Sequence, residues 1–174
     1  MASQRPLKAW LLALATTAGL LGVAQVASAE DLPVALQAVL LKKVLNYDRT
    51  LAQKKLKLAV VHKASEASAA EVVKAFEEVG ITSEVVTLAK LPGASATVAY
   101  LVADATTPEA QAACKSAGIL AVGGVEATAD SGLVAVAVTK RADGRPGIVI
   151  NLPAVQASGH DLSSDLLKLA RVVH

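Results

Sequence analysis

Short runs of apolar, largely β-branched residues alternate with helical patterns along most of this chain, and this alternation limits the fold more than any other feature. Strands that alternate with helices usually form a parallel sheet, because each connecting helix must cross back over the sheet. We therefore expect helices on both faces of a sheet. The predicted strands up to residue 124 are 56–62, 83–88, 97–103 and 119–122, and the predicted helices are 34–48, 68–79 and 107–117.

The pattern changes after residue 124. Two further apolar runs, 133–139 and 147–150, are separated by Asp143-Gly144, a pair that favours a tight hairpin turn. These two strands should be antiparallel. The predicted fold class is α/β: a single αβα layered domain over residues 30–174, with a mixed, mostly parallel sheet of Rossmann-like type.

The closing stretch, from Gly147 to Val173, contains a series of helix-capping residues. Asn151 follows a strand and can accept a hydrogen bond from the free N–H groups of a helix that starts there. Gly159 is placed to end this short helix, because glycine adopts the left-handed conformation of a helix end without strain. Either Ser163 or Ser164 then caps a last helix.

This last helix is expected to continue almost to the end of the chain. Apolar residues recur there at spacings of three and four, which predicts one buried face. They are Leu162, Leu166, Leu169 and Val173, with Leu167 and Ala170 beside them. We interpret the whole stretch as a strand and two helices that complete the core.

Residues 1–29 have the pattern of a secretory signal peptide. Arg5 and Lys8 form a basic start, an apolar run follows, and Ala27-Ser28-Ala29 is a small-residue cleavage site. We predict export and cleavage after Ala29, which leaves residues 30–174 as the mature protein. The alternative is an uncleaved N-terminal anchor, since the apolar run is nearly long enough to span a bilayer.

The charge balance argues against nucleic-acid binding. The whole chain has 17 Lys and Arg and 15 Asp and Glu, but Arg5 and Lys8 lie in the predicted signal. Residues 30–174 therefore carry no formal net charge, and they contain no basic run. Nucleic-acid-binding domains usually carry a clear positive patch.

The sequence contains no arrangement of residues typical of a metal or nucleophilic site. The histidines, His62, His160 and His174, lack metal-ligand spacing, and His160 is expected in a loop. The single cysteine, Cys114, lies among alanines in a predicted helix, which favours a buried thiol over pairing with another chain. No G-x-S-x-G motif is present. We expect no catalytic residue, no cofactor and no metal site.

Several polar residues near predicted strand or helix ends have two interpretations. Asp104, Glu126 and Asp130 could meet at the carboxyl edge of the sheet and act as acid or base, but loop acids of this kind are more often solvated. Asp48 and Arg49 form either a functional pair or, more often, a solvated helix end.

Gly123-Gly124 follows a strand, where a phosphate-binding loop can lie. The pair lacks the further glycines or the Gly-Lys of the known phosphate motifs, so a turn or hinge is the preferred interpretation. The segment that follows it, 125–132, is expected to be a loop.

The closing stretch also resembles the C-terminal signature of the YfiR-like periplasmic proteins. The resemblance rests on Ile150-Asn151-Leu152, Ala154, Gly159, Leu162-Ser163-Ser164, Leu166-Leu167 and Leu169-Ala170. It implies a periplasmic protein that binds the periplasmic part of an inner-membrane diguanylate cyclase and holds it inactive; other members are linked to histidine kinases. It also implies a homodimer. YfiR-like proteins commonly carry disulfides, and this chain, with one cysteine, departs from that pattern.

We therefore expect a non-catalytic, exported regulatory or sensory module that binds an inner-membrane signalling protein. The alternative is a small-ligand receptor, such as a one-domain solute-binding protein linked to a transporter; an enzyme of unrecognised type is a third possibility. Stable membrane insertion after signal cleavage is not expected. Partner binding is predicted on the first helix at Leu41, Leu45 and Tyr47, because the apolar face there is broader than one sheet covers.

Overall fold

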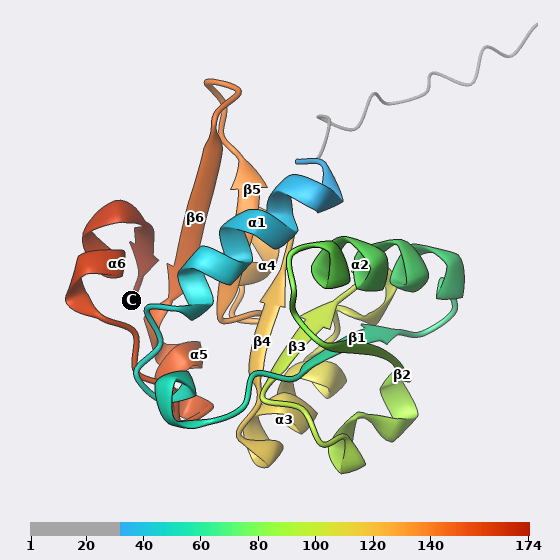
Figure 1. Cartoon of the computed structure of the whole chain (residues 1–174). Helices are drawn as coiled ribbons and strands as arrows, with labels where there is room; N and C mark the ends of the chain where they lie inside the picture. Colours follow the sequence, from blue (N-terminus) through green and yellow to red (C-terminus); the bar gives the residue numbers. More distant parts are fainter. Residues whose placement is uncertain (1–31) are drawn as a thin grey trace, which may run out of the picture.

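The computed structural model describes residues 32–174 and contains a seven-stranded sheet (Figure 1). The predicted signal peptide, residues 1–29, lies outside the described residues. The strand order is β2-β1-β3-β4-β5-β6-β7. The strands are β1 Leu58–His62, β2 Ser83–Thr87, β3 Val98–Leu101, β4 Leu120–Gly123, β5 Val136–Lys140, β6 Pro146–Asn151 and β7 Arg171–Val173.

The sheet is mixed and mostly parallel, as the sequence predicts. Strands β1 to β5 pair in parallel, β6 runs antiparallel to β5, and β7 pairs in parallel with β6. Every residue of β1, β3 and β4 is buried. Apart from His62, these central strands are apolar, because helices cover both of their faces.

Two layers of helices complete an αβα domain. Helices α1, Val34–Leu45, and α2, Glu66–Glu78, lie in front of the sheet in Figure 1, and α3, Pro108–Ala117, lies behind it. The core is correspondingly split, with Phe76 in one apolar cluster and the buried Cys114 in the other. The predicted single αβα domain is confirmed over the described residues.

Three local predictions were wrong. Helix α2 begins at Glu66, so the predicted start at residue 68 is two residues too late. The predicted loop 125–132 contains the short helix α4, Glu126–Asp130. The last helix, α6, Ser164–Leu169, ends early, and the residues after it form β7, because pairing with the open edge of β6 satisfies their backbone groups.

The capping predictions in the closing stretch are confirmed. The Asn151 carboxamide oxygen accepts the N–H of Ala154 at 2.9 Å and so caps α5, Leu152–Ala157. Gly159 follows that helix with φ of 74°. The Ser163 hydroxyl accepts the N–H of Leu166 at 3.4 Å at the start of α6.

The predicted apolar face of the last helix is confirmed in part. Leu162 and Leu166 are buried, and Leu167 packs partly against the same cluster. Leu169, in contrast, is 72% exposed, and Val173 belongs to β7.

Asn151 has a second role that a simple cap lacks, because its amide nitrogen donates to the carbonyl of Ala129 in α4 at 2.8 Å. Replacing Asn151 with Ala should therefore lower the free energy of unfolding by about 2 kcal/mol, because both the cap and the side-chain hydrogen bond to the Ala129 carbonyl are lost. Urea denaturation would measure it. Ser163→Ala, which removes a cap alone, is the matched control and should cost about 1 kcal/mol or less; equal costs would contradict the second role.

Candidate functional site

The predicted partner-binding residues on α1 do not share one face. Leu41 and Leu45 are buried in the apolar core, so their prediction as surface residues was wrong. The reason is that α1 packs against both the sheet and α2, which together cover more of the helix than one sheet would. Tyr47, just beyond the helix, is 42% exposed and remains a candidate.

A different set of α1 residues is exposed to solvent. Leu36 and Val39 are 38% and 40% exposed, Leu40 is half-buried, and Lys43 is fully on the surface. Their spacing of three and four residues puts them along one side of the helix, and Tyr47 continues this spacing beyond its end. We call this surface the α1 stripe: Leu36, Val39, Leu40, Lys43 and Tyr47.

The chain just after the α1 stripe is held by a buried pair of polar side chains. Asp48 Oδ2 lies 2.5 Å from His160 Nδ1, and both side chains are almost completely buried. Asp48 Oδ1 accepts the backbone N–H of Thr50 at 2.8 Å and that of Leu51 at 3.4 Å. The other ring nitrogen, His160 Nε2, lies 3.3 Å from the carbonyl oxygen of Gly118.

Both ring nitrogens of His160 thus face oxygen atoms. Burial alone would raise the pKa of Asp48. The hydrogen bond and Coulombic interaction with His160, together with the N–H groups of Thr50 and Leu51, outweigh burial and hold the pKa of Asp48 below its usual value. Asp48 is therefore a buried carboxylate whose oxygens are all used in hydrogen bonds.

Backbone contacts on either side extend this connection. The N–H of Arg49 donates to the carbonyl of Asp161 at 2.9 Å, and the N–H of Ser163 donates to that of Tyr47 at 3.0 Å. We call this set of contacts the Asp48–His160 clamp. The predicted solvated helix end was wrong for Asp48, although Arg49 is exposed and pairs with Asp161 at the surface. Contact between residues 112 positions apart leaves no signal in a single sequence.

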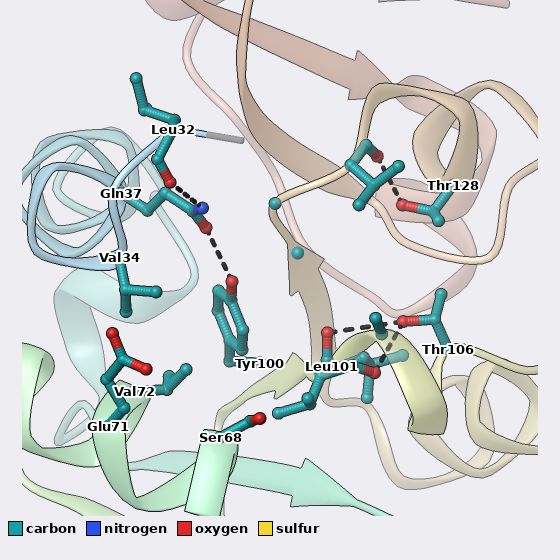
Figure 2. A pocket seen from close by; sticks show the side chains of 15 residues that line it. Leu32, Val34, Gln37, Ser68, Glu71, Val72, Tyr100, Leu101, Thr106 and Thr128 are labelled. Atoms are coloured by element: carbon teal, nitrogen blue, oxygen red, sulfur yellow. Dashed lines mark hydrogen bonds between the residues drawn. The ribbon is translucent and has the colours of Figure 1, made fainter. Parts of the chain in front are cut away.

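A cavity of about 470 Å³ lies at the carboxyl ends of β3 and β4 (Figure 2). The start of α1 and the first turns of α2 form its other walls. In open α/β sheets, ligands bind at this edge, where neighbouring strands direct their connections to opposite faces. Its walls are mostly apolar, with a few polar groups that include Gln37 and Tyr100.

Gln37 of α1 is buried beside this cavity and makes two side-chain hydrogen bonds. Its amide nitrogen donates to the carbonyl of Leu32 at 2.6 Å, and its oxygen accepts the hydroxyl hydrogen of Tyr100 at 2.7 Å (Figure 2). A Cβ on Gly124 would lie only 2.6 Å from that oxygen. The absence of a side chain at Gly124 therefore leaves the space that Gln37 occupies. This packing role agrees with the predicted turn and explains the glycine without a phosphate-binding loop.

The three acidic residues at the carboxyl edge all have partners. Asp104 accepts the N–H groups of Ala64 and Ser65, each at 2.7 Å, and these bonds lower the pKa of Asp104 to about 2. Glu126 and Asp130 both pair with Arg171, at 2.8 and 2.6 Å. Glu126 and Asp130 therefore do meet, but on the Arg171 guanidinium of β7, whereas Asp104 is bound separately at the start of α2.

The cysteine and the side chains that can bind metals form no reactive site in residues 32–174. Burial raises the pKa of the Cys114 thiol to about 12, so this cysteine stays protonated and unreactive at neutral pH. Within residues 32–174, no group of three or more His, Cys, Asp and Glu side chains is arranged to hold a metal ion. In the same range, no helix has the length and apolar character needed to cross a membrane.

The profile of the YfiR/HmsC-like family matches residues 35–171 of this chain. The protein belongs to this family. The match covers every element of the described fold from α1 to the start of β7, well beyond the C-terminal signature on which the sequence resemblance mainly rested. YfiR-like proteins are periplasmic regulatory domains, and no curated protein matches the chain.

Two solved structures share the fold of this YfiR/HmsC-like chain. One, from Streptococcus pneumonia, is described as an ABC domain in complex with L-Trp. Its TM-score is 0.59, its sequence identity is 14%, and the match covers 81% of this chain. The other is a conserved domain protein from Vibrio cholerae, with a TM-score of 0.61, a sequence identity of 17% and a match that covers 83% of this chain. This chain covers only 60% and 62% of those chains. At these identities the likeness shows the fold alone.

The buried Asp48–His160 pair yields a stability prediction. His160→Leu should lower the free energy of unfolding by about 3–5 kcal/mol, because it leaves the buried Asp48 carboxylate without its side-chain partner. The double variant Asp48→Asn/His160→Leu also removes the buried carboxylate charge and should recover part of that loss. Urea denaturation of both variants at neutral pH would measure the difference. A double variant no more stable than the single one would contradict the unpaired carboxylate as the main cost.

Asp104 gives a prediction for pH. Its pKa in the folded protein, about 2, is below the ordinary value of 3.8, so the folded state favours the carboxylate. The resulting stability is present above the ordinary value and is lost as pH falls from 3.8 toward 2. Asp104→Asn should therefore be less stable than the parent protein at neutral pH, and the difference should shrink through this window in urea unfolding. A difference that does not change with pH would contradict this assignment.

Proposed function

We propose that this protein is an exported, non-catalytic regulatory module that binds the periplasmic part of an inner-membrane signalling protein of the diguanylate cyclase or histidine kinase type. The observation that carries this proposal is membership of the YfiR/HmsC-like family over residues 35–171. The predicted signal peptide at 1–29, with cleavage after Ala29, agrees with a periplasmic location. A homodimer remains part of the proposal.

The side-chain contacts support a non-catalytic role. Each acid singled out in the sequence is used in a structural contact: Asp48 with His160, Asp104 with the start of α2, and Glu126 with Arg171. Cys114 is buried as a thiol. In the described part of the chain, no nucleophile lies beside a base that could activate it.

The α1 stripe is the surface that best fits partner binding. It combines the exposed apolar side chains of Leu36 and Val39 with Lys43 and the aromatic ring of Tyr47, and interface cores are rich in aromatic and apolar residues surrounded by polar ones. It replaces the buried Leu41 and Leu45 in the earlier prediction and keeps Tyr47.

Crosslinked pull-down of the tagged protein from whole cells, followed by mass spectrometry, tests this proposal. We expect recovery of a membrane-bound cyclase or kinase, and about tenfold lower recovery for the double variant Leu36→Ser/Val39→Ser, because hot-spot contacts of this kind contribute more than 1 kcal/mol each. The control is Val85→Ser on β2, whose side chain is 42% exposed on a different element. Circular dichroism would confirm that each variant is folded.

Undiminished recovery of the partner with Leu36→Ser/Val39→Ser would place its binding surface elsewhere. Recovery of a transporter permease instead of a cyclase or kinase would refute the regulator proposal.

A second candidate is a small-ligand receptor, and the cavity between α1, α2 and the strand ends is the observation that favours it. The similar structure from Streptococcus pneumonia is described as a complex with L-Trp, and this description supports the candidate at the level of the fold. A rise in melting temperature across a metabolite panel would favour this candidate, because a ligand that binds only the folded state stabilises it.

A further inference from the structure

The cavity has an asymmetric chemistry that narrows the class of ligand it can hold. Its volume, about 470 Å³, falls in the range of about 300–1,000 Å³ typical of small-molecule sites. Val34, Val72, Leu101 and Val102 give it apolar walls. Among its fifteen lining residues, Glu71 alone carries a charge at neutral pH (Figure 2).

Glu71 lies on the second turn of α2, and its carboxylate lies beside Val34 and Val72 in Figure 2. Among the residues that the structure describes, no group donates a hydrogen bond to this carboxylate or forms an ion pair with it. Glu71 is an exposed residue, and, unlike it, Asp48, Asp104, Glu126 and Asp130 all have such partners. A carboxylate with free acceptor oxygens at an apolar cavity favours a cation and disfavours an anion.

Neutral hydrogen-bonding groups occupy other positions around the same space. Ser68 lies one turn before Glu71 on α2, and its hydroxyl also has no partner among the described residues. Gln37 and Tyr100 are held by each other on another wall, and edge-to-face contact with Phe76, at 5.7 Å between ring centroids, fixes the Tyr100 ring. A preformed site of this kind orders few side chains when a ligand binds.

From this arrangement we propose that the cavity binds a small organic cation, a protonated amine with an apolar body, whose charge pairs with Glu71. The apolar body lies against the valine and leucine walls, and the ammonium donates hydrogen bonds to the carboxylate and to Ser68. This site goes beyond partner binding: it lies on the inner side of α1, and the α1 stripe lies on the outer side.

Three probes of similar size and different charge test the proposal by isothermal titration calorimetry with the signal-processed protein. They are phenethylamine, the neutral 2-phenylethanol and the anionic 3-phenylpropionate. We expect phenethylamine to bind about tenfold more tightly than the alcohol, which matches the contribution of one charge-assisted hydrogen bond, and the anion to bind most weakly.

Variants locate the binding. Glu71→Gln should reduce the preference for phenethylamine over the alcohol to about twofold or less, because the charge pairing is lost while the shape remains. Glu77→Gln, an exposed position on the same helix outside the cavity, is the matched control and should keep the full preference. Ser68→Leu fills part of the cavity with a good helix-forming residue and should weaken all three probes.

Three outcomes would each overturn the proposal. The first is equal affinity for the amine and the alcohol, and the second is a preference for the amine that Glu71→Gln leaves unchanged. The third is the absence of binding heat with phenethylamine up to about 10 mM, a concentration at which a ligand of this size should bind. None of these outcomes bears on the signalling partner, since the titration contains no partner and Leu36 and Val39 are unchanged in every variant. Failure of this proposal and failure of the partner proposal are therefore distinguishable.

Discussion

The buried contact between Asp48 and His160 connects the beginning of the fold to its end. Asp48 follows α1, and His160 lies in the turn between α5 and α6. A buried charge is tolerated only when it is paired and hydrogen-bonded, so the two segments must meet for either side chain to be stable in its place. The pair and its neighbouring backbone hydrogen bonds therefore fix the C-terminal segment beside the end of α1.

The sheet order explains why the cavity lies where it does. Strand β1 lies between β2 and β3, and the chain then proceeds in one direction through β4 and β5. Connections on the two sides of β1 cross opposite faces of such a sheet, which leaves space at the carboxyl ends of the strands near this reversal. Helix α1 enters from outside the alternating series and closes this space, with Gln37 held against Tyr100 and next to Gly124.

The sequence predicted the parts of this structure that depend on local pattern. The alternating strands and helices, the antiparallel pair around Asp143-Gly144 and the cap at Asn151 all follow from residues close in sequence. What failed depends on contacts between distant segments. Leu41 and Leu45 were expected at the surface, but they are buried in the apolar cluster between α1, the sheet and α2. Asp48 was expected in solvent, but it is buried against His160.

The end of the chain shows the same limit. The apolar spacing of its last residues favours a helix. A helix there would leave the backbone N–H and C=O groups on the edge of β6 unpaired, whereas the same residues pair with these groups as strand β7. Likewise, nothing in the spacing of Gln37, Glu71 and Gly124 indicates that they border one cavity. Candidate sites made of such distant residues become visible only when the fold is known.

Helix α1 takes part in each of the features that bear on function. Gln37 lies next in sequence to Leu36, but successive residues on a helix project about 100° apart, so one side chain reaches the cavity and the other reaches solvent. A ligand can change partner affinity only if it interacts differently with two arrangements of an element that the partner also contacts. Helix α1 is placed where such coupling would act: its first turns border the cavity, its outer side is the α1 stripe, and the Asp48–His160 clamp fixes its far end. A shift of α1 would therefore be largest at Leu36 and Val39, near the cavity, and smallest at Tyr47.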